Sequence, residues 1–334
     1  MIQLVQDFVL NFSSILWEAM PFIVLGALVA GILEELLPQQ LIGKIMPNHP
    51  VPAVIIGGLL GLIFPMCECG IVVVMRRLLR KGLPLSCCVT YMLAGPIVNV
   101  IVLLSTYVAF GGLKQDGGIG WEMVAIRGGM GFLVACGAGL VVHRLQQKAG
   151  LHALLTASAA PPKVKALSLV DEDEPKAPKK SILQRLGNIS STAIHDFLDI
   201  TVFLILGALL AAAAKSFISP DDLTSLSRDT PYLAIPAMMF LAVIMCLCSE
   251  ADAFVAASFT EMSVSSKVAF LVLGPMLDLK LLLMYTRVFR GKLIAVIVTC
   301  TVIQTLVYSL VLHQVYNPMP GEAGATVSVA TPNP

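Results

Sequence analysis

Two pairs of cysteines, each of the form Cys-x-Cys, are the residues in this sequence best suited to chemistry. Cys67 and Cys69 flank Glu68 in "PMCECG", and Cys246 and Cys248 stand in "MCLCSE". Sulfur ligands are soft and prefer soft ions such as Cu(I), zinc and, by the same argument, trivalent arsenicals. The four cysteines are therefore predicted to bind a thiol-seeking solute, and they are the candidate ligands for a metal ion. The alternative is a helix end at the membrane interface that carries incidental cysteines.

The first pair needs an irregular backbone if both thiols are to face one ligand. Residues two apart on an ideal helix point in nearly opposite directions, so Cys67 and Cys69 would diverge. Pro65 precedes the pair and Gly70 follows it. Proline breaks a helix and glycine relaxes one, so unwound backbone is predicted from Pro65 to Gly70.

The second pair lies in "CLCSEADAFVAASF", which contains neither proline nor glycine. This copy is therefore expected to stay helical, with Cys246 beside Glu250 and Cys248 beside Asp252 at the i, i+4 spacing. A charged residue at the bilayer centre costs roughly 2.5–3.5 kcal/mol on insertion scales. Glu250 and Asp252 are therefore predicted to face the interior and to serve proton coupling or cation binding. The alternative is that both carboxylates are solvated at the interface.

The composition sets the environment of these residues. Of 334 residues, 57% are hydrophobic and only 13% are charged, whereas a soluble domain carries about 25% charged residues. The chain is therefore predicted to be an integral membrane protein. A net charge of +1 gives no attraction to nucleic acid. There is no G-x-x-x-x-G-K-[ST] loop and no H-E-x-x-H pair, so ATP-driven transport, enzyme activity and a cofactor are not expected.

Apolar segments long enough to approach a membrane span recur along the chain. They predict an all-α polytopic fold with about eight transmembrane or re-entrant helices. The segments run near 13–37, 51–75, 84–110, 120–142, 192–217, 232–256, 266–286 and 292–314.

The two halves of the sequence repeat. Gly95-Pro96 follows the first cysteine pair at the same distance at which Gly274-Pro275 follows the second, and Asn99 and Asp278 come next. Such repeats are typical of secondary transporters, whose sites lie at interrupted helices near the midplane. Broken helices are therefore predicted at both Gly-Pro pairs, with a packing kink as the alternative. The predicted substrate-binding residues are Cys67, Glu68, Cys69, Gly95, Pro96, Asn99, Cys246, Cys248, Glu250, Asp252, Gly274, Pro275 and Asp278.

This pattern divides the chain into a first membrane half (1–143), a charged cytoplasmic linker (144–189), a second membrane half (190–315) and a flexible tail (316–334). The basic run from Arg76 to Lys81 and the linker lysines both indicate the cytoplasm, which places the N-terminus there too. Eight full crossings would then leave Arg287 and Arg290 outside. One segment around a Cys-x-Cys pair is therefore predicted to be a re-entrant hairpin, and the repeat is either parallel or inverted.

The stretches "CECGIVVVMRRLLRKGLPLSCCVTYMLAGPIVN" and "CSEADAFVAASF…VLGPMLDLKLLLMY" resemble a bacterial predicted-permease family. This family includes the YraQ-type proteins and the organoarsenical efflux permeases of ArsP type. The resemblance covers residues 10–145 and 190–314. It implies an inner-membrane permease of about eight helices. In the arsenical-exporting members it implies extrusion of trivalent organoarsenicals through cysteine thiols, here Cys67, Cys69, Cys246 and Cys248.

The sequence predicts a secondary transporter for a soft, thiol-seeking solute, and the resemblance implies that trivalent organoarsenicals leaving the cell are this solute. Three alternatives stand beside this function: a zinc or copper permease, a membrane thiol–disulfide oxidoreductase, and a receptor that binds its ligand without transporting it. The expected partners are a small-molecule or ion substrate and the lipid bilayer, and assembly into a homo-oligomer is left open.

Overall fold

The computed structural model describes residues 2–36, 49–111, 119–156, 159, 182–217, 231–260 and 262–316. These residues are almost entirely helical, and their only bridge of β type joins Leu155 to Phe289. Among these residues, five helical stretches are long and apolar enough to cross a membrane. The prediction of an all-α polytopic membrane protein is therefore confirmed. The predicted tail beyond Tyr316 and the middle of the predicted linker, 160–181, lie outside the described residues.

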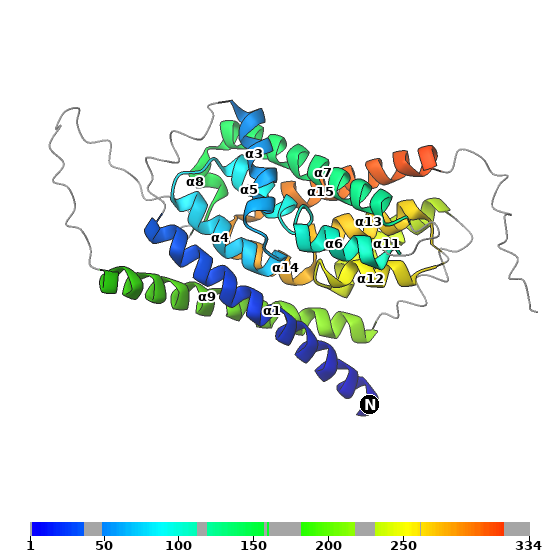
Figure 1. Ribbon diagram of the computed structural model, residues 1–334, viewed down its shortest axis with the longest axis horizontal. Coiled ribbons are helices and arrows are strands. Elements are labelled where there is room, and N and C mark those ends of the chain that lie inside the picture. The colour runs from blue at the N-terminus through cyan, green and yellow to red at the C-terminus, as the bar shows by residue number, and fades with distance from the viewer. Residues whose placement is uncertain are drawn as a thin grey trace, which may run out of the picture.

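Each half of the chain contains one long helix, two pairs of short helices and a second long helix (Figure 1). The first half consists of α1 (Ile2–Leu36), α3 (Pro50–Ile63), α4 (Glu68–Arg80), α5 (Leu85–Ala94), α6 (Val100–Ala109) and α7 (Gly120–Ala149). The short α8 (Leu151–Leu154) follows. The second half consists of α9 (Ile182–Phe217), α11 (Pro231–Met245), α12 (Ala251–Ser258), α13 (Val264–Met276), α14 (Leu279–Val288) and α15 (Gly291–Tyr316). Both ends of the stretch predicted as linker are thus helical.

The predicted breaks in the first half are confirmed. The chain leaves helical geometry between Ile63 and Glu68, around Pro65, and again between Ala94 and Val100, around Gly95-Pro96. In the second half Pro275 lies in the last turn of α13, and the break follows at Leu277–Asp278. A proline in the last turn removes one hydrogen bond and ends the helix shortly afterwards.

Two expectations about the cysteine segments were wrong. Gly70 does not relax the backbone but lies inside α4, where an added Cβ would come within 2.8 Å of the Phe22 carbonyl oxygen. Its role is the close approach of α4 to α1. The second segment does not stay helical between Cys246 and Glu250, because Lys280 and Arg127 donate hydrogen bonds to the carbonyl oxygens of Cys246 and Ser249.

The two halves run in opposite directions. We call the end of the molecule that carries the end of α7, helix α8 and the start of α9 the linker end, and the opposite end the far end. Arg290, just before α15, donates to the Leu155 carbonyl oxygen at 3.0 Å, so α15 starts at the linker end. At the other end of α15, Tyr316 bonds Glu122 near the start of α7. Helices α7 and α15 are therefore antiparallel, although they hold equivalent places in the two halves.

Helices α1 and α9 show the same inversion. They lie side by side along one face of the molecule (Figure 1). Gly31 of α1 approaches Ile189 of α9, whereas Ile15 packs in one cluster with Ala208 and Ala211. The two helices are therefore antiparallel, and the repeat is inverted, as in many secondary transporters.

The first Cys-x-Cys segment forms the predicted re-entrant hairpin. Helix α3 starts at the linker end, where Val54 lies near Gly139 of α7, and α4 returns there to place Arg76 beside α9. This hairpin also corrects the predicted topology. Helix α1 starts at the far end, so the placement of the N-terminus on the side of the linker was wrong. The ion pair of Arg287 with Asp199 of α9 brings this second-half arginine to the linker end as well, which removes the conflict in the distribution of basic residues.

Candidate functional site

A small cavity lies where the break before α4 meets α1 and the start of α14. Its volume is only about 10 Å³. Three of the four predicted cysteines line it, together with two acidic residues and one lysine. The lining residues are Ile15, Glu18, Ala19, Phe22, Cys67, Glu68, Cys69, Cys248 and Lys280.

The start of α4 positions the first two thiols. Cys67 is the N-cap residue of α4 in extended conformation, and Glu68 and Cys69 form its first turn. The break before Cys67 changes the direction of the chain, and both side chains line the same cavity. The first turn of a helix also presents unpaired N–H groups, which favour negative charge at this point.

Lys280 of α14 holds the buried charges of the cavity together. Its ammonium group donates to Glu68 Oε1 at 3.0 Å and to the Cys246 carbonyl oxygen at 3.2 Å, and it lies 3.4 Å from Asp278 Oδ2. All three charged side chains are buried. Within this triad two carboxylates share one ammonium group. Glu68 Oε2 has no hydrogen-bond partner among the described residues.

A second buried ion pair joins the two halves beside the break after α11. Arg127 of α7 is fully buried and lies 3.5 Å from Asp252 of α12. It also donates to the Ser249 carbonyl oxygen at 2.9 Å and to Thr106 at 2.8 Å. The guanidinium group therefore fixes the irregular backbone after the second cysteine pair to α6 and α7.

The second cysteine pair divides between two surroundings. Cys248 reaches the cavity, and its thiol donates to Glu250 Oε2 at 3.0 Å. Cys246 has a φ of 47° and is the only described non-glycine residue with positive φ. Its thiol donates to the Val243 carbonyl oxygen and packs in an apolar cluster with Ile15 of α1 and Ala208 of α9. Only the Cys246 carbonyl oxygen takes part in the polar site.

The predicted Gly-Pro residues support the site without lining the cavity. Gly95 packs against Gly61 of α3, and Gly274 lies beside Asp252. The two polar residues after them are N-caps. Asn99 accepts from Ile101 N at 3.0 Å to begin α6, and Asp278 accepts from Leu281 N at 2.7 Å to begin α14. Of this group, only Asp278 also faces Lys280.

Sequence reasoning did not assign Lys280 and Arg127 to the site. Both are charged residues within apolar segments, and an ionisable residue in a membrane segment is by itself a sign of a functional site. On an ideal helix Lys280 would point away from Asp278, so the sequence gives no sign that the two side chains pair. Asp278 is an N-cap in extended conformation, and this places its carboxylate near the ammonium group.

The residues predicted as metal ligands do not form a metal site in the described part of the chain. No group of three His, Cys, Asp or Glu side chains there is arranged to hold a metal ion. The cavity instead offers three thiols beside a charged triad, a set of groups that suits reversible binding of a soft solute.

The model of the predicted permease family ArsP_1 matches residues 4–314, nearly the whole chain. The chain belongs to this permease family. The permease is 36% identical to the UPF0718 protein YcgR of Bacillus subtilis over 305 residues, which cover 90% of the chain and 95% of the relative. It is 33% identical over 302 residues to a Streptococcus mutans protein named as a subunit of a two-component membrane permease complex, covering 90% and 93% of the two chains. No solved structure matches the permease.

Proposed function

We propose that this permease is a secondary transporter for a soft, thiol-seeking solute in the inner membrane, and that trivalent organoarsenicals leaving the cell are its substrate. The cavity that gathers Cys67, Cys69 and Cys248 at the meeting point of both halves carries this proposal. Three thiols within one small cavity can exchange on a soft centre, which can therefore pass from one sulfur to the next without leaving the protein.

The break before α4 supports this function. Transporters with inverted repeats bind their substrates where interrupted helices meet near the middle of the membrane. Here one helix start, Cys67 to Cys69, lies next to the start of α14, which carries Lys280. A relative motion of the two halves would change the surroundings of the thiols and of Lys280 at once. The ion pair between Glu68 and Lys280 joins the two halves.

The buried carboxylates have a separate role in the proposal. Glu68 and Asp278 share one ammonium group, and Asp252 faces Arg127. Two carboxylates around one ammonium group leave a net negative charge, which a coupled proton or cation would balance. Glu250 accepts a hydrogen bond from the Cys248 thiol, and it takes the thiol proton when the sulfur binds the solute. For export from the cell, the linker end faces the cytoplasm. The linker, residues 144–189, then lies in the cytoplasm and connects the membrane halves 1–143 and 190–315.

Transport into everted membrane vesicles tests the function. Vesicles that contain the wild-type protein are expected to accumulate a trivalent organoarsenical such as methylarsenite, and vesicles with Cys67→Ser and Cys69→Ser are expected to lose most of this flux. Cys136→Ser, at a half-buried position outside the cavity, is the matched control. Unchanged flux in the double variant would refute the role of the thiols.

Two further measurements separate the alternatives. Zinc and copper flux in the same vesicles would reveal a transition-metal permease. Trapping of thiols by a mass tag, before and after reduction, would reveal a thiol–disulfide oxidoreductase, because the adjacent thiols of Cys67 and Cys69 would then cycle between two oxidation states. For the proposed function we expect these two cysteines to be fully labelled without prior reduction.

A further inference from the structure

A second cavity lies at the linker end. Basic side chains outnumber acidic ones in its lining, whereas acidic side chains outnumber the lysine in the first cavity. The second cavity lies between α4, α9 and α14 and has a volume of about 400 Å³. We call it the arginine cavity and define it by its charged lining residues, which are Arg76, Arg77, Arg80, Arg287, Asp196 and Asp199. The basic run on α4, predicted to be a topology signal, thus forms one wall of a cavity.

The two aspartates of α9 organise the arginine cavity. Asp196 pairs with Arg76 and, through both carboxylate oxygens, with Arg77 at 2.7 and 2.8 Å. Asp199 pairs with Arg76 at 2.5 Å and with Arg287 at 2.6 Å. The guanidinium groups of Arg76, Arg77 and Arg287 are therefore held in position by the two aspartates, and the pairs of Arg76 and Arg77 join both halves of the chain.

The lining side chains carry a surplus of positive charge. Four arginines and two aspartates line the cavity, so basic side chains outnumber acidic ones in its lining. Arg76 is only 3% exposed, and its Nε has no hydrogen-bond partner among the described residues. A buried donor without a partner is rare in folded proteins and points to a missing acceptor.

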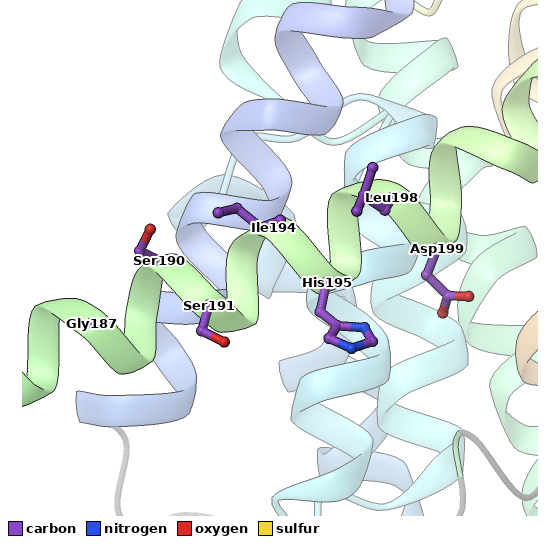
Figure 2. A pocket seen from close by; sticks show the side chains of 7 residues that line it. All are labelled: Gly187, Ser190, Ser191, Ile194, His195, Leu198 and Asp199. Carbon is purple, nitrogen blue, oxygen red and sulfur yellow. The ribbon is translucent and has the colours of Figure 1, made fainter.

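An apolar trough on α9 continues from the arginine cavity. Figure 2 shows Ser191, His195 and Asp199 pointing to one side of α9, and Ile194 and Leu198 pointing to the other. The first three of these residues line both the trough and the arginine cavity. Ile194 and Leu198 are 57% and 59% exposed, as expected for side chains that face lipid chains.

We propose that the arginine cavity binds a phosphate-bearing anion, and that this anion is the headgroup of an acidic phospholipid whose chain lies along Ile194 and Leu198. Arginine forks match phosphate oxygens in pairs, and a phosphate brings the acceptors that Arg76 Nε lacks. Basic pockets between membrane helices on the cytoplasmic side bind acidic headgroups in this way. A bound lipid would bridge α4, α9 and α14, and would thus stabilise one arrangement of the two halves.

Lipid binding to the purified full-length protein tests this proposal. In neutral detergent, native mass spectrometry is expected to show preferential retention of phosphatidylglycerol over phosphatidylcholine of equal chain length. The variant Arg80→Gln/Arg287→Gln is expected to bind phosphatidylglycerol roughly 30-fold more weakly, a factor of about five for each arginine. Arg144→Gln is the matched control, because Arg144 is an exposed arginine of α7 outside the arginine cavity.

Inorganic phosphate distinguishes the sources of the ligand. Competition by phosphate for bound phosphatidylglycerol supports the headgroup as the occupant, and phosphate binding without any lipid preference assigns the cavity to a free anion instead. Equal retention of the two lipids by the wild type, together with no phosphate binding, overturns the proposal without any variant. Equal phosphatidylglycerol affinity of the wild type and the double variant also overturns it. Transport through the cavity lined by Cys67, Cys69 and Cys248 is measured separately and can fail independently.

Discussion

The two Cys-x-Cys segments share a sequence pattern, a place in the repeat and a broken backbone, yet they present their cysteines differently. In the first segment both thiols line the small cavity between α1, α4 and α14, and they do so from the start of α4. In the second, Cys248 lines the cavity, whereas Cys246 turns its thiol into an apolar cluster and its carbonyl oxygen toward Lys280. The repeated pattern therefore produces one pair of thiol ligands and one segment that combines a thiol with a backbone ligand.

The neighbours of each segment explain the difference. The first break follows from Pro65, and glycine contacts between α1 and α4 hold the new helix in place. The second break contains no proline or glycine and depends on Lys280 and Arg127, which bond the carbonyl oxygens of Cys246 and Ser249. One break is thus encoded locally, and the other is imposed by basic residues that are distant in sequence.

The largest effect is expected at Lys280, on which the second break depends. Lys280→Met leaves Glu68 and Asp278 buried without a positive partner, and breaking a buried ion pair costs about 3–5 kcal/mol. Thermal unfolding of the purified protein in detergent should show a much lower Tm. Lys267→Met, a lysine in the first turn of α13, should change the Tm only slightly.

A second variant tests whether the loss at Lys280 comes from its buried partner. Adding Glu68→Gln to Lys280→Met removes one uncompensated carboxylate and is expected to restore part of the Tm. If the double variant is no more stable than Lys280→Met, the pairing of Glu68 with Lys280 contributes little to stability.

The next effect separates the two cysteines of the second segment. Cys248→Ser removes a thiol from the cavity and is expected to reduce solute flux roughly tenfold or more, since even outer-shell partners of a bound metal contribute about 10–100-fold in affinity. Cys246→Ser keeps the carbonyl contact with Lys280 and should retain most of the flux. Vesicle transport measures both variants, and equal losses would contradict the different placement of the two thiols.

The smallest effect compares glycine with alanine at one position of each segment. Cys246 has a φ of 47°, a conformation that costs a residue with a Cβ about 1–2 kcal/mol, so Cys246→Gly should be more stable than Cys246→Ala. Cys69 lies in the first turn of α4, where glycine is less favourable than alanine by about 0.5–1 kcal/mol. Thermal unfolding of the four variants should therefore show opposite orders of stability at the two positions. The same order at both would contradict the left-handed conformation at Cys246.

Much of the fold could be predicted because it depends on local pattern. Pro65 and the pair Gly95-Pro96 mark the breaks of the first half, and apolar length marks the long helices α7 and α15. The break after Met245 could not be predicted, since its cause lies in side chains of α7 and α14. Likewise, Gly70 reads as a flexible point in the sequence, but its role is to let α1 approach α4.

By itself, the sequence determined a membrane-spanning helical chain and the breaks of its first half, and it predicted two repeated halves with four thiols for a soft solute. Only the structure separates Cys246 from the three thiols that share one cavity. Only the tertiary structure decided that the halves run in opposite directions, that Arg76 faces α9, and that Lys280 meets Glu68 across 212 positions of the chain. The physical reason is that hydrophobic length and helix breaks are properties of neighbouring residues. The pairing of buried charges depends instead on which helices pack together, because each charge in the membrane interior needs a partner wherever the fold supplies one.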